Sequence, residues 1–385
     1  MKRLLLIVLA ACHGKKAAPI VDDAPPTHVV IDAPAKDDWS ALKDFTKVDP
    51  VRVIPLPTRT TVPRFDVGGP VIAGGVAVVA SSQFGFIGVD YRDGKILWTK
   101  PSGEHVAPPI VRDGNFILVG ECEQEPFLKP GQTLLGCVRT VSPTGGDLGF
   151  VSIHGSKVDD FAGEPGTQQL WNAGDRLVWK RGEKAVTFDP ADGLAQMTDA
   201  APVVDVKVKD DTWAVTQSED GTIHAVNKKK EWHTDRHYTA LVGAVYMPSQ
   251  PPAVRVANAG RFAGVPELNI FDIDAAGSLA GQVAIPTPGI GLVGHAIDAV
   301  GNTALAVQLD RTLDHHFIVG YAANALLMWV YPLPRVQRAD PVGLAVASDA
   351  VVVFHDGDTL TVLPELSAPA TAPGAVRVPS ENPTP

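Results

Sequence analysis

The sequence has few of the patterns that are typical of helices, of membrane-spanning segments or of proteins that bind polyanions. Aromatic residues make up 6% of the 385 residues. Helical periodicity is nearly absent, and residues 38–45 are the only plausible helical turn before the repeated units described below. The N-terminal apolar run, Leu4–Leu9, is far too short to span a membrane as a helix. The formal net charge is −10. Without a basic cluster, the chain is not expected to bind nucleic acid or to adhere electrostatically to a membrane.

Sequence motifs of catalysis and nucleotide binding are also missing. The motifs G-x-S-x-G and H-E-x-x-H and the phosphate-binding P-loop do not occur. A G-x-G-x-x-G stretch at Gly289–Gly294 follows prolines and precedes no helix of useful length, so we interpret it as a loop between repeats. Asp272 and Asp274 resemble the start of a calcium loop. Ala276 and Val283 occupy ligand positions there, so this segment is predicted to be a turn.

Histidines occur in two groups that could in principle hold a metal. They are His233 with His237 and His315 with His316. A shared site would require two loops from different repeats to meet on one face of the protein. We therefore predict solvated loop histidines, with a metal site as the alternative. No catalytic residue and no metal ligand is assigned.

A short β-unit recurs along the chain, most clearly at Pro70–Trp98. Val76–Ala80 is a continuous run of small apolar residues, typical of an inner strand that is buried on both faces. After a second strand, Asp90 and Gly94 suit a tight turn, because Asp accepts bonds from nearby amides and Gly adopts a positive φ. Lys95–Trp98 then returns as a strand whose tryptophan can fill the gap between neighbouring sheets.

Weaker copies of this unit follow at intervals that fit the blades of a β-propeller. The turn position recurs every 38 to 52 residues. The positions taken as equivalent are Asp90, Ser142, Asp189, Asn227, Asp272 and Ala322, with a truncated seventh copy at Leu363–Glu365. One four-stranded blade per copy predicts an all-β fold, a seven-bladed β-propeller of antiparallel blades.

The last blade needs a strand from elsewhere in the chain. Beyond Leu366 the sequence is rich in Pro and Ala, so the seventh copy lacks an outer strand. Outer strands at Gln282–Pro288 and Trp329–Pro334 end in prolines, because an edge strand can spare an amide donor. Val51–Pro57 has the same pattern upstream of the first unit. We expect this N-terminal strand to complete the last blade and close the ring.

The pattern P-V-x-x-G-x-V…G…D-x-x-x-G-x-x-x-W within residues 70–98 resembles the repeats of the pyrroloquinoline-quinone (PQQ)-type propeller superfamily. The match is fair at 108–145 and 202–232 and weaker in the other copies. The resemblance implies the fold without implying the cofactor, because many such propellers are empty scaffolds. Its quinoprotein enzymes have eight blades, acidic calcium ligands and, in many cases, a disulfide between neighbouring cysteines. Seven repeats and no adjacent cysteines do not fit that pattern, so no cofactor is expected.

The N-terminus resembles the signal of a bacterial lipoprotein. Lys2 and Arg3 precede the apolar run, and Leu9–Cys12 has the form of a lipobox. Residues 1–11 are therefore expected to be removed and Cys12 to be lipidated. The alternative is an ordinary secretory peptide that contains a cysteine. Because His13 is not the aspartate that retains some lipoproteins at the inner membrane, the periplasmic face of the outer membrane is the favoured location.

Three further segments follow the predicted signal. Residues 12–45, rich in Ala, Pro, Asp and Lys, are predicted to be a flexible tether. Residues 46–366 are assigned to the propeller, and 367–385 to a disordered, Pro-rich tail.

Two other cysteines, Cys122 and Cys137, flank an excursion between two β-type runs. In an exported protein this arrangement favours a disulfide across the base of a long hairpin. Two free or metal-binding thiols are the alternative, but no further ligands lie nearby in the sequence. Closing a loop of this size stabilises the fold by about 3 kcal/mol on the chain-entropy model.

Taken together, these features predict a lipid-anchored, non-enzymatic and monomeric propeller of the bacterial envelope. Its expected partner is an envelope protein or component. The alternative function is an envelope enzyme, either a quinoprotein-type oxidoreductase or a hydrolase with dispersed acidic residues. A propeller alone does not distinguish the two, because unrelated activities use this fold.

Overall fold

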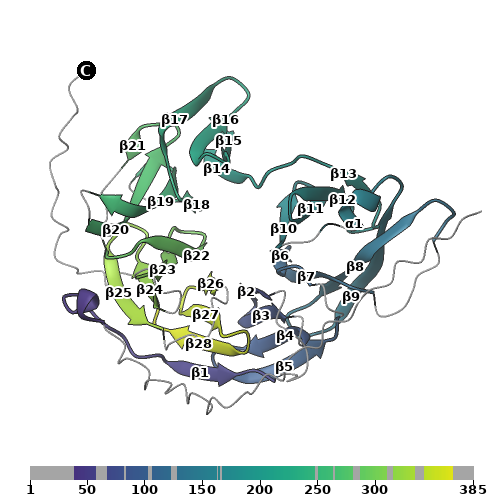
Figure 1. Ribbon diagram of the computed structural model, residues 1–385, viewed down its shortest axis with the longest axis horizontal. Helices are drawn as coiled ribbons and strands as arrows, with labels where there is room; N and C mark the ends of the chain where they lie inside the picture. Colours follow the sequence, from purple (N-terminus) through teal and green to yellow (C-terminus); the bar gives the residue numbers. More distant parts are fainter. Residues whose placement is uncertain are drawn as a thin grey trace, which may run out of the picture. The chain divides into compact units, whose positions relative to one another are not determined.

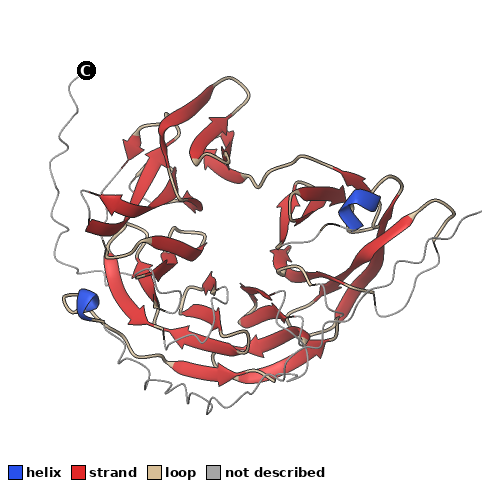
Figure 2. Ribbon diagram, viewed as in Figure 1, coloured by secondary structure: helices blue, strands red, loops and turns tan. Residues whose placement is uncertain are grey.

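Seven four-stranded antiparallel sheets make up the computed structural model of the protein (Figure 1). The structure describes residues 39–366 apart from 58–66, 82–83, 103–105, 123–127, 163, 165–166, 248–249, 263–264, 281–286, 310–314 and 334–341. The described residues are almost all in strands and turns, with two short helices (Figure 2). The prediction of a seven-bladed β-propeller with four-stranded antiparallel blades is confirmed.

The first four blades each use four consecutive strands. Blade one contains β2 (Val67–Ala73), β3 (Val76–Ser81), β4 (Gly85–Asp90) and β5 (Lys95–Lys100). Blade two contains β6 (Ile110–Arg112), β7 (Asn115–Gly120), β8 (Thr133–Val141) and β9 (Asp147–Gly155). Blade three contains β10 (Gln168–Ala173), β11 (Arg176–Arg181), β12 (Lys184–Phe188) and β13 (Ala195–Met197). Blade four contains β14 (Val204–Val208), β15 (Asp211–Gln217), β16 (Thr222–Val226) and β17 (Glu231–His237).

The remaining blades follow the same plan, except that the last one borrows a strand. Blade five contains β18 (Ala240–Val245), β19 (Ala253–Phe262), β20 (Val265–Asp274) and β21 (Leu279–Ala280). Blade six contains β22 (Gly291–Ile297), β23 (Thr303–Gln308), β24 (His316–Tyr321) and β25 (Leu327–Pro332). Blade seven contains β26 (Gly343–Val346), β27 (Val351–His355), β28 (Thr359–Leu363) and β1 (Arg52–Pro55). The helices are η1 (Ser40–Leu42) and α1 (Asp159–Ala162).

Blade one shows how the sequence unit folds. Every residue of β3 is buried, because this middle strand is covered on both faces. At the β4–β5 turn, Asp90 Oδ1 accepts bonds from the amides of Arg92 and Asp93 at 3.0 and 3.1 Å. Gly94 completes the turn with a φ of 75°. The turn chemistry expected for Asp90 and Gly94 is confirmed.

Three outer strands carry a tryptophan that reaches the next blade. Each indole Nε1 donates to a main-chain carbonyl oxygen there: Trp98 to Pro143 at 3.0 Å, Trp232 to Ala275 at 3.0 Å and Trp329 to Glu365 at 3.4 Å. Trp98 and Trp329 are buried. These side chains join blade one to two, four to five and six to seven, in the gap-filling role expected for the tryptophan of the repeat.

Between blades five and six, an arginine makes the equivalent contact. Arg255 is fully buried, and its Nε and Nη2 donate to the Asp272 carboxylate at 2.8 and 2.9 Å. Nη2 also donates to the main-chain oxygen of Ala323 at 2.7 Å, and Nη1 donates to that of Gly301 at 2.7 Å. A buried guanidinium with this many acceptors ties two blades together.

The assignment of Asp272 as a turn residue is wrong. Asp272 lies on β20 and pairs with Arg255, while the following turn is organised by Asp274. Asp274 Oδ1 accepts bonds from the amides of Ala276 and Ser278 at 2.8 and 3.0 Å. The segment is a turn, as predicted, but it begins two residues later.

An N-terminal strand closes the ring, as predicted. β1 pairs antiparallel with β28, from Arg52 opposite Val362 to Pro55 opposite Thr359, and Ile54 points into the core. The strand therefore covers the edge that blade seven would otherwise expose.

Blade seven is also tied to blade one. Tyr91 Oη donates to one oxygen of Asp349 at 2.7 Å, and Arg92 Nε donates to the other at 2.6 Å.

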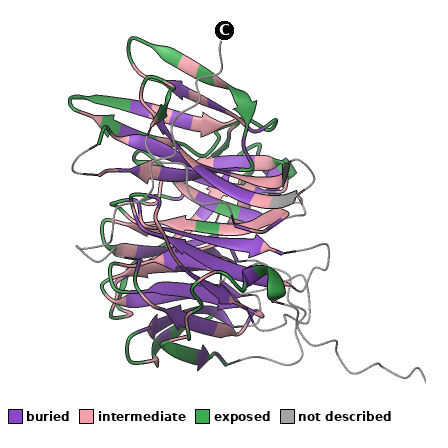
Figure 3. Cartoon of the chain, turned by 90° about the vertical axis from the view of Figure 1, so that its left-hand side faces the viewer, coloured by how far each residue is buried: buried purple, intermediate pink, exposed green. Residues whose placement is uncertain are grey.

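Apolar clusters lie between neighbouring blades and hold them together. Clusters of buried side chains join blade pairs one–two, two–three, four–five, five–six, six–seven and seven–one. The strands are largely buried, and exposed residues gather on turns and outer strands (Figure 3). The fold is thus held by side chains between sheets as well as by the sheets themselves.

Contact with the propeller begins earlier in the chain than residue 46. Leu42, in the segment assigned to the tether, is fully buried in the core of blades five and six, and Trp39 and Phe45 pack against the same core. Among the described residues, no helix is long and apolar enough to cross a membrane. The predicted signal at 1–11, most of the tether and the tail at 367–385 lie outside the described residues.

Candidate binding cleft

The junction between blades three and four, here called the seam, differs from the other six. Among the described residues, no cluster of buried apolar side chains joins these two blades. β13 and β14, which belong to the two blades, are joined by the connection at residues 198–203 (Figure 1).

A glutamine stands at the seam where other blades have their tryptophan. Trp98 pairs with Gly88, two residues before the turn that ends β4. In blade three the same position belongs to Gln196, which pairs with Thr187, two residues before the turn residue Asp189. Gln196 is exposed. Blade three therefore lacks the apolar side chain that docks blades one, four and six onto their neighbours.

The face of blade three toward the seam is mostly polar. Leu170, Leu177 and Trp179 pack toward blade two, so the alternate residues of the same strands face the other way. Cross-strand pairing places these residues on one face: Gln169, Trp171, Val178, Lys180, Ala185, Thr187 and Gln196. Only Val178 and Ala185 among them are buried.

The opposing face of blade four is polar as well. Trp213, Val215 and Ile223 pack toward blade five. The alternate positions on the other face include Asp205, Lys207, Thr212, Ala214, Thr216 and His224. In most other blades the middle strands are apolar on both faces. Among the described residues, no apolar cluster covers this face of blade four.

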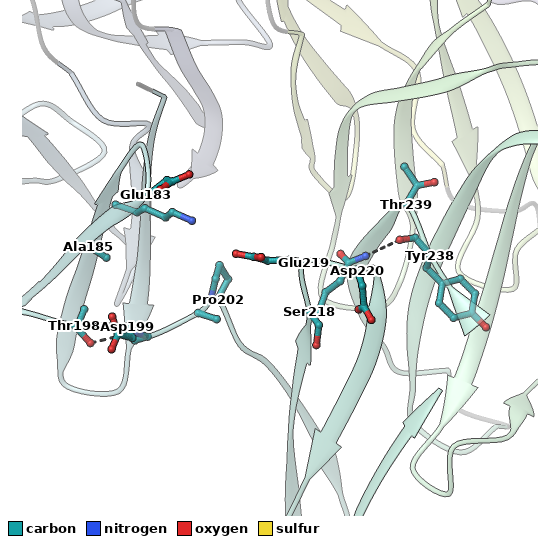
Figure 4. Close-up of a pocket in the computed structure, with 15 residues that line it drawn as sticks. Glu183, Ala185, Thr198, Asp199, Pro202, Ser218, Glu219, Asp220, Tyr238 and Thr239 are labelled. Atoms are coloured by element: carbon teal, nitrogen blue, oxygen red, sulfur yellow. Dashed lines mark hydrogen bonds between the residues drawn. The ribbon is translucent and has the colours of Figure 1, made fainter. Parts of the chain in front are cut away.

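A cleft of about 570 Å³ opens at this seam (Figure 4). Blade three contributes Lys180, Glu183 and Ala185, and the connection contributes residues 198–202. Blade four contributes residues 217–221, and Tyr238 and Thr239 follow at the start of blade five. A volume of this size is typical of ligand pockets.

Negative charge dominates the lining of the cleft. Glu183 and Asp199 lie on the side of blade three and its connection, and Glu219 and Asp220 lie on the β15–β16 turn of blade four. Lys180 is the one cationic side chain among the lining residues. Glu219 extends from its turn into the space between the two blades (Figure 4).

Both walls of the cleft are anchored to the fold. On one side, the amide of Thr198 donates to the carbonyl oxygen of Ala185 at 3.0 Å. On the other, Gln217 Nε2 donates to the carbonyl oxygen of Tyr238 at 2.8 Å, and the amide of Leu241 donates to Gln217 Oε1 at 3.0 Å. The acidic turn is therefore held by blade five as well as by blade four.

Hydrogen bonds keep the Asp220 carboxylate ionised. Its Oδ1 accepts bonds from the Thr222 amide at 3.0 Å and from the Thr222 hydroxyl at 2.7 Å. These bonds hold the pKa of Asp220 below its usual range. Asp220 is thus a fixed negative charge near neutral pH.

Of the residues singled out from sequence, the structure brings Cys122 and Cys137 together. They form a disulfide at the base of the β7–β8 excursion, as predicted. Cys12, the predicted lipidation site, lies outside the described residues.

The histidine groups do not meet. His233 and His237 lie on β17 of blade four, whereas His316 begins β24 of blade six. The prediction of solvated loop histidines is wrong for His316, which is buried because β24 is a middle strand. His233 and His237 are exposed, as predicted, but they lie on a strand rather than in a loop. In the part of the chain that the structure describes, no group of three or more His, Cys, Asp or Glu side chains is placed to hold a metal ion.

The G-x-G-x-x-G stretch also differs from its interpretation as a loop. Gly291–Ile297 forms β22, the first strand of blade six. An added Cβ at Gly294 would lie 2.5 Å from the main-chain oxygen of Val342 in blade seven. This glycine therefore permits close packing of two blades.

Sequence reasoning missed the seam, although a signal for it is present. In Thr222–Ala225, polar and apolar residues alternate, which is typical of a strand with one solvated face. The strands at Val76–Ser81 and Val351–His355 are nearly continuous apolar runs instead.

Several solved structures align with this chain at low identity. A chain in the crystal structure of a mitotic checkpoint complex is 12% identical with a TM-score of 0.48, over 95% of this chain and 99% of that chain. BamB from Moraxella catarrhalis is 11% identical with a TM-score of 0.40, over 82% and 96%. Hsv2p from Kluyveromyces lactis is 9% identical with a TM-score of 0.42, over 76% and 89%. No protein-family model matches the sequence, and no curated protein matches it. Similarities at this level transfer neither a family nor a function to the chain.

Proposed function

We propose that this protein is a non-enzymatic binding scaffold, a lipid-anchored propeller of the bacterial envelope that holds an envelope protein or component at its seam. The observation that carries the proposal is the cleft lined by the β11–β12 turn region, the 198–203 connection and the β15–β16 turn, at the one junction of the described ring without an apolar core. Binding clefts are placed on rigid frames in this way, with anchored walls and an open space between them.

The charge of Asp220 favours recognition over proton transfer. A general acid or base works best with a pKa near the working pH. The Asp220 carboxylate is instead engaged by Thr222, and its pKa is lowered. A carboxylate of this kind is suited to attracting a cationic group.

The cellular location rests on the two cysteine features. The lipobox at Leu9–Cys12 supports anchoring by lipid, and His13 favours the outer membrane over the inner one. The Cys122–Cys137 disulfide supports an oxidising compartment such as the periplasm.

Membership of the PQQ-type superfamily is part of the proposal. The motif of residues 70–98 supports it, as does the repetition of the tryptophan contact in three blades. The cofactor itself is not proposed to bind.

The scaffold is tested with the lipidated protein in its native membranes. Tagged protein is purified from detergent-solubilised envelopes, and the retained envelope protein is then tagged and used for the reciprocal purification. We expect each tagged protein to recover the other. We also expect no change in the melting temperature or absorbance of the protein when PQQ and calcium are added. A thermal shift or a new absorbance band would favour the quinoprotein alternative, and failure of the reciprocal purification would contradict the scaffold.

A further inference from the structure

We propose that the seam is a docking groove for an extended, basic segment of a partner protein, lying between the facing sheets of blades three and four. This inference rests on the proposed function and specifies what the scaffold holds and where. It follows from three properties of the seam: its uncovered sheet faces, the size of its cleft and the sign of its charge.

The uncovered faces supply groups that suit a peptide main chain. Outside the lining of the cleft, Gln169 and Gln196 on blade three face the seam, as do Thr212 and Thr216 on blade four. Neutral amide and hydroxyl groups both donate and accept hydrogen bonds, as peptide groups do. A small cation would use the carboxylates alone and would leave these groups to water.

The size of the cleft limits the occupant to a segment. About 570 Å³ accommodates a short stretch of chain with its side chains and is far too small for a folded domain. An extended segment advances about 3.3 Å per residue and presents side chains alternately to two sides. Such a segment can meet blade three with one set of side chains and blade four with the other.

The charge of the lining selects a basic segment. Four carboxylate side chains, those of Glu183, Asp199, Glu219 and Asp220, line the cleft, against one ammonium group, that of Lys180. Glu183 and Glu219 come from opposite walls, so a basic segment in the cleft has a carboxylate on either side. Complementary charge of this kind raises the association rate and fixes the register of the bound segment.

The probe is a synthetic peptide of alternating Lys and Ser, with a matched peptide of alternating Glu and Ser. Binding to the intact protein is measured by fluorescence anisotropy, and the site is located by hydrogen exchange. We expect only the Lys peptide to bind, more weakly as salt is raised. Slowed exchange is expected in the β15–β16 turn and at residues 198–203.

Charge reversal in the cleft provides the matched comparison. The double variant Glu183→Lys/Glu219→Lys is expected to lower the affinity for the Lys peptide by about tenfold or more, since two attractive charges become repulsive. Asp93→Lys, on an exposed turn of blade one, is expected to leave the affinity unchanged. Unchanged melting temperatures verify that both variants are folded.

Three results would contradict the proposed docking groove: no binding of the Lys peptide, equal binding of that peptide by both variants, or protection from hydrogen exchange confined to other blades. If the native envelope partner is still recovered reciprocally in that case, only the groove is wrong. If the partner is lost as well, the scaffold function fails with it.

Discussion

Gln196 occupies in blade three the position that Trp98 occupies in blade one. Trp98 lies opposite Gly88 and bonds to blade two through the oxygen of Pro143. Gln196 lies opposite Thr187 and is exposed. The same position in the repeat therefore joins two blades at one junction and leaves a polar surface at the other, and the candidate cleft lies at the polar one.

Truncating a tryptophan should distinguish a packed junction from the seam. Trp98→Ala is expected to destabilise the protein by about 3–5 kcal/mol, because it empties a buried site between two blades. Trp171→Ala, on the seam face, is expected to cost about 1 kcal/mol. Denaturant unfolding monitored by circular dichroism measures both. Similar losses for the two variants would mean that the seam is packed like the other junctions.

The buried Arg255–Asp272 pair should be strongly coupled. Arg255→Met alone leaves a buried carboxylate without its partner and is expected to cost about 3–5 kcal/mol. The double variant Arg255→Met/Asp272→Leu should cost clearly less than the sum of the two single changes. A double-mutant cycle on thermal unfolding measures the coupling, and additive effects would show that the pair does not act as a unit.

The fold was predictable because the residues that define its repeat act on their near neighbours in the sequence. Turn residues such as Asp90 and the outer-strand prolines near Val51–Pro57 act within a few residues of themselves, so blade count and ring closure follow from the sequence. Asp272 was misassigned because its partner, Arg255, lies 17 residues away, and no turn pattern reveals a buried ion pair. The seam could not be predicted without the strand register of blades one and three, because only that register shows that Gln196 takes the position of Trp98.

The tie between blades one and seven should depend on pH. The bonds from Arg92 and Tyr91 lower the pKa of Asp349, so this carboxylate stabilises the fold above its unfolded pKa of about 3.9. That contribution is lost as the pH falls through the lower folded value. We expect Asp349→Asn to lower the melting temperature at neutral pH and to have little effect in strong acid. An equal deficit at both pH values would argue against the ionic contact.

Ring closure should depend on the strand at Arg52–Pro55. Deleting residues 46–60 uncovers the edge of β28 and is expected to lower the melting temperature sharply and to promote aggregation. Deleting residues 13–37, which precede every described contact, is the matched control and should change little. Equal melting temperatures for the two deletions would mean that β1 does not close the ring.

Hydrogen exchange of the free protein tests the central claim, that the described residues of blades three and four face each other without an apolar core. Middle strands packed on both faces should exchange slowly, and those beside an unpacked junction should open more readily. We predict that β11 and β15 exchange faster than β3 and β23, the corresponding second strands of blades one and six. Equally slow exchange in all four strands would contradict an open seam.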